Sequence, residues 1–365
     1  MNRRTVVILA LLAGVFAVLA FVGQIRDRSD SIAGDSAGML LLPDLAADLE
    51  EVQQIFISGA GRETLVSLEL AGGEWVVVEQ DNYPAATNKI NALMIALAET
   101  RIVEEKTLNP DFYSRLGVQD VAAADATGLE VALQSANGDR YAVLLGDAYG
   151  NDQRYARVAD QAQSVLIDRD PEIPRNAGEW VETAILSVAR DRVQRVDIRH
   201  ADGETLAIYK ETPGESSFTV DAVPEGRELQ YPGVADISGS VLEDLQLEAV
   251  APQSAAESDV LVSSEYRTFD GLIVAVTATA DEAGDPWLSF SARFDAEQAL
   301  AFADVSTVDI GDGSADTSGD GDVVAEALAI NDRLQGWRYR IPSYQYTQLT
   351  RRMEDLLRAP AVSDE

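Results

Sequence analysis

The residue types that carry most enzyme chemistry are scarce in this chain of 365 residues. It contains no cysteine, which excludes disulfides, thiolate catalysis, thiolate-bound metals and anchoring through a lipidated cysteine. His200 is the only histidine, so neither a histidine metal cluster nor a relay of two histidines can form. It falls in the turn of a predicted hairpin, so we expect a solvent-exposed turn residue rather than a general base.

The motifs of common enzyme classes are also missing. Neither a G-x-S-x-G elbow nor a G-x-x-x-x-G-K-[ST] loop occurs, and Gly59-Ala-Gly61 lacks the third glycine of a dinucleotide fingerprint. The 62 acidic residues offer many carboxylate pairs for glycoside hydrolysis, but no spacing selects one pair. We therefore predict no catalytic residues, no cofactor and no metal site. A carboxylate-dependent hydrolase acting on a glycan is the alternative.

One acidic segment invites a calcium interpretation. Residues 309–322 read DIGDGSADTSGDGD, and hard cations take several carboxylate oxygens. The spacing does not match the calcium loop that ends in a bidentate glutamate. We expect a solvated acidic loop, with calcium binding as the alternative.

The charge of the chain limits its partners. It has 28 lysines and arginines against 62 acidic residues, a formal net charge of −34. Such a polyanion repels phosphate backbones, so nucleic acid is excluded as a partner. Residues 1–30 hold four arginines and two aspartates, so the remaining 24 bases and 60 acids leave a net charge of −36 on the rest of the chain.

An N-terminal segment predicts how the chain is held in place. No charged residue occurs from Thr5 to Ile25, and about 20 helical residues span the ~30 Å hydrocarbon core of a membrane. Val18 and Ala20 also fit a cleaved signal peptide, but the apolar run is longer than a signal h-region. We predict a single-pass signal anchor in residues 1–30, with the C-terminal bulk outside the cytoplasmic membrane.

The chain also repeats itself. Residues 52–69 align without gaps on residues 193–210, and seven of the 18 positions are identical. Each copy predicts a hairpin followed by a third strand, over Glu74–Glu79 and Ser217–Asp221. A second match pairs residues 128–133 with residues 271–276.

A helix is predicted after the third strand of each copy. Apolar residues recur at helical spacing behind a Thr87 cap in the first copy and behind Asp236 in the second, where the set is Ile237, Val241, Leu242 and Leu245. Further helices are predicted over Trp180–Leu186, Val323–Leu334 and Tyr346–Leu357.

These elements predict an α+β protein. An N-terminal transmembrane helix precedes two tandem repeated modules of antiparallel strands with one main helix each. The predicted parts are the anchor at 1–30, a first module at 40–170, a linker helix at 171–190, and a second module at 191–358 with the acidic loop 309–322.

Two groups of side chains are candidates for contact with a partner. Arginines crowd residues 190–199, where we expect them to bridge carboxylates of their own domain, with an acidic partner as the alternative. Residues 337–341 alternate aromatic or aliphatic residues with arginines, which predicts a strand with one buried face or, alternatively, an exposed patch. The candidate contact residues are Arg192, Arg195, Arg199, Trp337, Arg338, Tyr339 and Arg340.

Several short sequences carry a resemblance to a known family. They are Leu40-Leu-Leu-Pro43, Gly73-Glu-Trp-Val-Val, the Trp180 segment leading into Arg192–Ile198, Gly336–Pro342 and Met353–Leu357. Together with the N-terminal anchor they make the chain resemble the bacterial domain-of-unknown-function 4340 family. Phe218 stands where the first module has Trp75, which departs from the pattern.

The resemblance implies a membrane-anchored envelope protein, often encoded beside ABC transporter subunits like those of gliding-motility systems. It implies no catalytic residues. We therefore expect a non-catalytic binding or scaffold protein in the periplasm, anchored in the bacterial inner membrane and auxiliary to an ABC transport system. The alternatives are the glycan hydrolase and a ligand-binding protein with its cleft between the modules.

Overall fold

The structure is a computed structural model that describes residues 36–253, 259–306 and 318–359. The predicted anchor over residues 5–25 and most of the acidic loop 309–322 lie outside the described residues. Among the residues described, no helix combines the length and the apolar character needed to cross a membrane.

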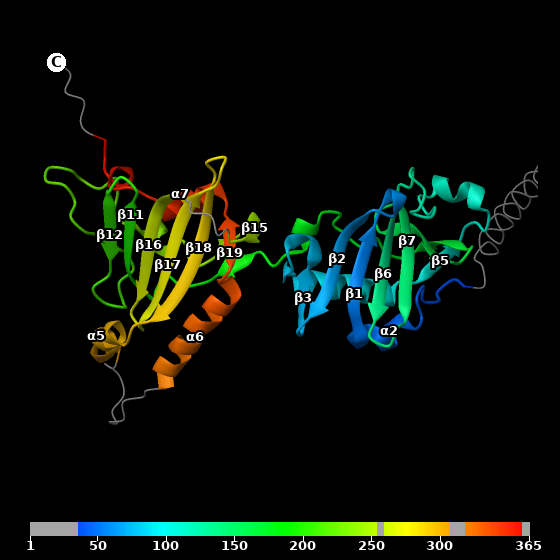
Figure 1. The fold of residues 1–365 in the computed structure, drawn as a ribbon, viewed down its shortest axis with the longest axis horizontal. Coiled ribbons are helices and arrows are strands. Elements are labelled where there is room, and N and C mark those ends of the chain that lie inside the picture. The colour runs from blue at the N-terminus through cyan, green and yellow to red at the C-terminus, as the bar shows by residue number, and fades with distance from the viewer. Residues whose placement is uncertain (1–35, 254–258, 307–317, 360–365) are drawn as a thin grey trace, which may run out of the picture. The chain divides into compact units, whose positions relative to one another are not determined.

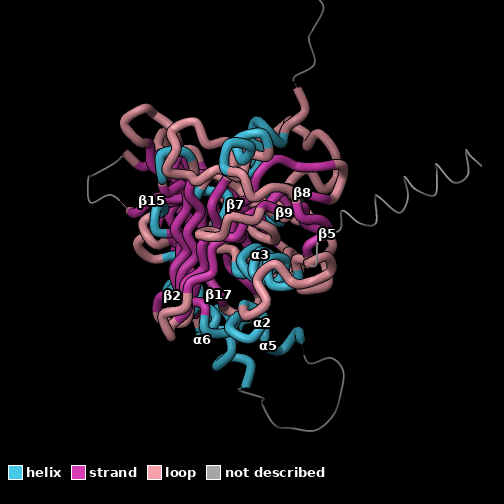
Figure 2. The backbone as a smooth tube through the Cα atoms, turned by 90° about the vertical axis from the view of Figure 1, so that its right-hand side faces the viewer, coloured by secondary structure: helices cyan, strands magenta, loops and turns pink. Residues whose placement is uncertain are grey.

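The chain divides into two compact units, residues 1–181 and residues 182–365. Each unit contains a large antiparallel sheet (Figure 1), and more of the described chain is strand than helix (Figure 2). The predicted α+β class is confirmed at this level.

The first unit is built on a nine-stranded sheet with one main helix. Its strands are β1 (Val52–Ser58), β2 (Thr64–Ala71), β3 (Glu74–Val77), β4 (Tyr83–Pro84), β5 (Ile102–Glu105), β6 (Leu129–Ser135), β7 (Arg140–Tyr149), β8 (Gln153–Val158) and β9 (Ser164–Ile167). Its helices are α2 (Leu45–Asp48) and α3 (Thr87–Glu99), with 3-10 turns η1 (Leu49–Glu51), η2 (Ala60–Arg62), η3 (Val78–Gln80), η4 (Pro110–Arg115) and η5 (Ala177–Trp180). The strand order is β4-β3-β2-β1-β6-β7-β8-β9-β5.

The core of this unit follows from the two sequence periods. Ile55 and Ile57 alternate along β1 and are fully buried, and Ile90 and Leu97 on α3 are buried as well. The predicted helix is confirmed, but Thr87 is its first helical residue rather than its cap, because Ala86 occupies the cap position.

The second unit is built on an eight-stranded sheet. Its strands are β10 (Ala184–Leu186), β11 (Val193–His200), β12 (Thr205–Tyr209), β13 (Thr219–Val220), β14 (Leu245–Gln246), β15 (Ala249–Pro252), β16 (Val260–Thr268), β17 (Leu272–Ala280), β18 (Pro286–Phe294) and β19 (Trp337–Arg340). Its helices are α4 (Asp236–Ser240), α5 (Ala296–Ser306), α6 (Ser318–Leu334) and α7 (Ser343–Leu349), with the 3-10 turn η6 (Met353–Leu356). The order is β13-β12-β11-β16-β17-β18-β19-β15, and β10 pairs separately with β14.

Both sheets follow the same path. Without β4, the first sheet has the order β3-β2-β1-β6-β7-β8-β9-β5. Strand by strand, this order corresponds to β13-β12-β11-β16-β17-β18-β19-β15 in the second sheet. The ladder between β1 and β6 shifts register between Val52 and Gln54. The ladder between β11 and β16 shifts at the equivalent place, between Val193 and Arg195. A bulge that recurs at Gln53 and Gln194 is a feature of the shared architecture.

The second of the two sequence matches joined strands that do not correspond. Residues 129–133 lie in β6, whereas residues 272–276 lie in β17, and the counterpart of β6 in the strand order is β16. The two glycines also serve different purposes. Gly271 takes a φ of 87° in a turn, while a Cβ on Gly128 would lie 2.1 Å from the carbonyl oxygen of Gly117.

Several helices predicted in the second half are shorter or broken. Helix α4 ends at Ser240, and Leu245 begins β14 instead of continuing the helix. The predicted terminal helix 346–357 separates into α7 and η6, because Arg352 is extended and its guanidinium binds Asp202 and Glu204 at the β11–β12 turn. In contrast, α6 begins at Ser318, within the segment expected to be an acidic loop.

The segment 171–190 was expected to contain a linker helix, and this is wrong. It contains the 3-10 turn η5 and the strand β10, and the two units divide between Val181 and Glu182. The Trp180 indole is buried and donates to the carbonyl oxygen of Pro174. The Trp180 carbonyl accepts from the amide of Ala86, which ties this segment to the first unit.

His200 is buried rather than exposed in a turn. It is the last residue of β11, on the same face as Val196 and Ile198, and only 6% of it is exposed. Its Nε2 lies 3.3 Å from the carbonyl oxygen of Arg351, in the segment that follows α7. The turn prediction failed because β11 extends one residue further than its apolar pattern suggests.

Tyr266 supplies a test of the second core. Its side chain is fully buried on β16, burial raises its pKa, and its hydroxyl has no hydrogen-bond partner among the described residues. Tyr266→Phe removes an unsatisfied polar group, so we expect the free energy of unfolding to stay equal or rise by about 1 kcal/mol in urea titrations. Ile198→Val on β11 is the control and should cost about 1 kcal/mol. A loss of stability in Tyr266→Phe would show that the hydroxyl is bonded.

Candidate functional site

The candidate site is the face of the second sheet that points away from its core. Residues alternate along β16, where Ser264 and Tyr266 are buried while Ser263, Glu265 and Arg267 are half-buried. The register of β11, β16, β17 and β18 places one set of side chains on this outer side. We define the open face by Arg195, Asp197, Arg199, Ser263, Glu265, Arg267, Ala275, Thr277, Trp287, Ser289, Ser291, Arg293, Arg338 and Arg340, all half-buried or exposed.

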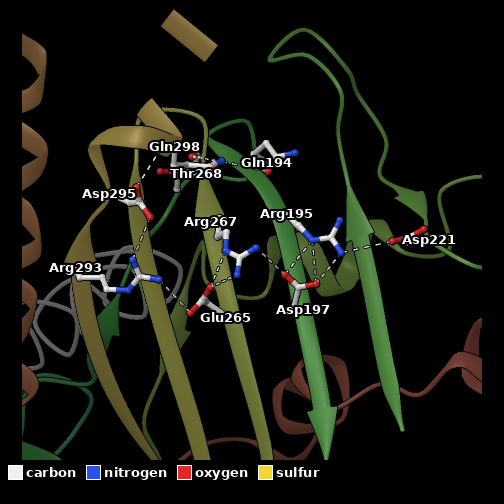
Figure 3. A network of polar contacts seen from close by, with 10 residues as sticks. All are labelled: Gln194, Arg195, Asp197, Asp221, Glu265, Arg267, Thr268, Arg293, Asp295 and Gln298. Carbon is white, nitrogen blue, oxygen red and sulfur yellow. Dashed lines mark hydrogen bonds and ion pairs between the residues drawn. The ribbon is translucent and has the colours of Figure 1, made fainter. Parts of the chain in front are cut away.

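A row of alternating charges crosses the open face (Figure 3). Asp197 lies between two guanidinium groups, 2.9 Å from Arg195 and 3.3 Å from Arg267. Glu265 lies between Arg267, at 2.5 Å, and Arg293, at 3.4 Å. The row ends on Asp221, 3.5 Å from Arg195, and on Asp295, 3.3 Å from Arg293.

The ion pairs of the row offset the like-charge neighbours that the sheet register brings together. Arg195 stands directly opposite Arg267, and Asp197 directly opposite Glu265, so both cross-strand pairs carry like charges, which is unfavourable. Each carboxylate therefore bonds along its own strand or diagonally to the neighbouring strand. The hydrogen bonds to Asp197 raise the pKa of Arg195.

Figure 3 also shows how one helix is tied to the end of this face. The Gln298 amide, on α5, donates to the Gln194 side chain and to the carbonyl oxygen of Thr268, both at 3.3 Å. Gln194 is the bulged residue of β11, so the bulge provides the contact for the helix.

A second cluster on the open face surrounds Trp287. The guanidinium carbons of Arg338 and Arg340 lie 4.6 Å and 5.9 Å from the centre of the indole ring, within range of a cation–π interaction. The indole nitrogen donates to Asp281 at 3.0 Å. Small residues, including Ser263, Thr277 and Ser289, separate this cluster from the row of charges.

The sequence-predicted contact residues fall into three places. Arg195, Arg199, Arg338 and Arg340 meet on the open face. Tyr339 is fully buried on the other side of β19, opposite Leu288, and Trp337 is half-buried on that same side. The prediction of a strand with one buried face is therefore confirmed.

Arg192 lies apart from the open face. It borders a hollow of about 650 Å³ between the end of the sheet and helices α5 and α6, and it binds Glu326 with both terminal nitrogens and Asp270 with Nε. The hydrogen bonds to Glu326 raise its pKa. Arg190 likewise pairs with Asp236 at 2.8 Å, so bridging within the domain describes both residues.

The sequence prediction missed two of the six arginines of the open face and its tryptophan. They are Arg267, Arg293 and Trp287, which lie on β16 and β18 rather than in the crowded segment 190–199. Their signal in the sequence is alternation with buried residues, as in Trp287-Leu-Ser-Phe-Ser-Ala-Arg293.

Arginines dominate the chemistry of the open face. It presents six arginines and two acidic residues on its strands, and both acidic residues are held by arginines. Within residues 36–253, 259–306 and 318–359, no cluster of three His, Asp or Glu side chains is placed to hold a metal ion.

By its fold, the molecule is an α+β protein with two large antiparallel sheets. Comparison with known families matches residues 75–263 to the family described as Domain of unknown function (DUF4340). That range covers more than half of the 365 residues, so the chain belongs to this family, as the sequence resemblance predicted. No curated protein and no solved structure matches the chain.

The row of charges predicts a salt-dependent stability. Arg267→Ala leaves Asp197 and Glu265 facing each other with one arginine each, so we expect a loss of about 1 kcal/mol in the free energy of unfolding at low salt. At about 1 M salt the Debye length falls to about 3 Å, and the loss should shrink. Arg358→Ala, which removes an exposed pair with Glu228, is the control and should change little. An effect of Arg267→Ala that is independent of salt would contradict the electrostatic account.

Asp281 predicts a pH dependence. The hydrogen bond from Trp287, with backbone amides, holds its pKa below the ordinary value of 3.8. Its ionised form therefore contributes stability that is present above pH 3.8 and is lost as the pH falls through the lowered pKa. Asp281→Asn should be less stable at neutral pH and should lose less on acidification, as measured by urea midpoints between pH 6 and the acid limb. Parallel acid limbs in the two proteins would refute this assignment.

Proposed function

We propose that this protein is a non-catalytic binding or scaffold protein, and that the open face of its second unit docks on an acidic surface of a partner protein. The observation that carries the proposal is the gathering of six of the chain's 28 basic residues on one side of one sheet. The arginines are Arg195, Arg199, Arg267, Arg293, Arg338 and Arg340.

Electrostatics favour this assignment. The region beyond residue 30 carries a net charge of −36, so an acidic partner is repelled everywhere except where arginines are concentrated. Such a patch orients the encounter and excludes wrong partners more than it adds affinity. Arginine and tryptophan, both present here, are the residue types enriched at binding hot spots.

Two of the arginines are available for a partner. Arg199 is exposed and has no ion pair among the described residues. Arg340 is exposed and, within the part of the chain that the structure describes, reaches one carboxylate, that of Asp285 at 3.9 Å. The row through Arg195, Arg267 and Arg293 is already bonded internally, so it serves as a rigid support beside them.

The architecture supports the proposal that one module was duplicated. The corresponding strand orders and the recurring bulge at Gln53 and Gln194 agree with the aligned hairpins at residues 52–69 and 193–210. The two modules differ in their helices and in what their outer faces carry, as expected if each acquired its own binding task.

We place this protein in the bacterial inner membrane, with residues 1–30 as a single-pass signal anchor and the described units in the periplasm. The apolar segment 5–25 supports this placement. Membership of the family and its implied gene neighbours make a subunit of an envelope ABC transport system the expected partner.

The hydrolase alternative is less well supported. Four carboxylates line the hollow beside α6, those of Asp191, Asp270, Asp322 and Glu326. Asp270 and Glu326 both bind the guanidinium of Arg192. Both of these carboxylates therefore serve to hold Arg192 in place.

The proposal is tested by reversing charge on the open face. Membranes are prepared from cells that express the full chain or its Arg199→Glu/Arg340→Glu variant, and they are crosslinked and solubilised. The proteins that co-purify with the chain are then identified. We expect the original chain to capture a subunit of an ABC transporter and the variant to lose at least tenfold of that signal. Arg227→Glu/Arg358→Glu, a matched double reversal in the same unit but off the open face, should capture normally.

Two outcomes would overturn the proposal. Capture of no transporter subunit by the original chain would reject the expected partner. Equal loss in both double variants would show that total charge, and not the open face, governs binding.

A further inference from the structure

The first unit contains a polar hollow of about 390 Å³ on the outer side of its sheet. Its floor is a single row of register partners across four strands, Ser58, Glu130, Leu144 and Arg157. Its walls are Arg62, Asp120, Val121, Arg140, Ala159 and Asp160. Three arginines therefore converge on one hollow in a strongly acidic protein.

A loop brought close to the sheet covers part of this row. A Cβ on Gly146 of β7 would lie 2.0 Å from the carbonyl oxygen of Leu116, so only glycine permits the approach. The loop is held further along, where the amide of Arg62 donates to the carbonyl oxygen of Val121. Two side chains of the loop itself, those of Val118 and Val121, are buried. The hollow is thus shaped by backbone that is fixed in place.

Arg157 is buried in this hollow without a carboxylate partner. Only 7% of the residue is exposed. Its Nε donates to the carbonyl oxygen of Val118 at 3.0 Å and its Nη1 to that of Gln161 at 2.9 Å, while the guanidinium stacks on Tyr113 at 4.6 Å. Among the described residues, no carboxylate lies within ion-pair distance of it and its Nη2 has no hydrogen-bond partner. Buried charges are normally paired, so this guanidinium calls for a ligand.

The other charges of the hollow do not neutralise Arg157. Glu130 pairs with Arg140 at 2.6 Å, and Asp120 lies 3.7 Å from Arg62. Asp160 is exposed in a left-handed turn, where water screens its charge. The buried end of the hollow is therefore positive, although its lining contains equal numbers of basic and acidic residues.

We propose that this hollow binds the oxyanion group of a small ligand, a carboxylate or a phosphate. The free Nη2 of Arg157 would bind it at the floor, and Arg62, which is 69% exposed, would close over it from the rim. A volume of about 390 Å³ suits a small molecule. This site is separate from the open face and does not depend on the function proposed for it.

The site belongs to the first unit alone. Following the ladders from β11 through β16 and β17 to β18, the position that corresponds to Arg157 is Ser289. Serine carries no charge there, so the second unit offers no counterpart to the buried guanidinium.

Calorimetric titration of the full chain with inorganic phosphate, acetate and succinate tests the proposal. We expect at least one anion to bind with one-to-one stoichiometry, and the preference between phosphate and the carboxylates identifies the chemistry of the ligand. Arg157→Gln should weaken binding about tenfold or more, because it removes a charge-assisted hydrogen bond in a buried site. Arg62→Gln, at an exposed position that folding does not require, should weaken it several-fold.

Arg293→Gln, on the open face of the other unit, is the control and should bind as the original chain does. Circular dichroism establishes that each variant is folded, and Arg62→Gln carries the test if Arg157→Gln is not. The proposal is overturned if none of the three anions binds the original chain at millimolar concentration. It is also overturned if the folded arginine variants of the hollow bind as tightly as Arg293→Gln.

Discussion

Each large sheet depends on the pairing of one strand, β1 in the first unit and β11 in the second, on both of its sides. Strand β1 bonds to β2 on one edge and to β6 on the other, and β11 bonds in the same way to β12 and β16. This joins a local hairpin to a meander that starts far along the chain. Because side chains alternate across a strand, burying Ile55 or Val196 on the core side obliges their neighbours to face outward. The outer faces, where binding is proposed, are a consequence of that alternation.

The two units differ in the length of the connection that leads to β6 or β16. In the first unit residues 106–128 lead from β5 to β6, and part of this segment lies against the outer side, where Val118 and Val121 are buried. In the second unit residues 253–259 connect β15 to β16, and the open face keeps its half-buried and exposed side chains among the described residues. One framework therefore supports a covered hollow in one unit and an open surface in the other.

In this acidic chain, the arginines differ in whether they have a carboxylate partner. Arg192 and Arg195 are held by carboxylates of their own unit, which makes them structural supports. Arg199 is exposed without an ion pair among the described residues, and Arg157 is buried with only neutral acceptors. In a chain with 62 acidic residues, an arginine without a carboxylate is a better guide to binding than an arginine in a crowded sequence.

Local patterns in the sequence determined much of the fold. The hairpins at 52–71 and 193–209, helix α3 and the family were all predictable, because period-two and period-3.6 burial are properties of neighbouring residues. The crowded arginines at 190–199 and the alternation at 337–341 pointed to part of the open face. Its strand partners, Arg267, Trp287 and Arg293, were not predictable as members, because which strands lie side by side is a non-local property.

The tertiary structure alone decided which side of each strand is covered. The sequence predicts His200 in a turn, whereas the structure buries it next to the segment after α7. The match of residues 128–133 with 271–276 predicts a repeat, whereas the strand order shows that β6 and β17 do not correspond. Arg157 was one arginine among many in the sequence. It became a candidate ligand-binding residue only because a loop from residues 116–121 packs over β7 and β8, leaves only 7% of the residue exposed, and offers it a backbone carbonyl but no carboxylate.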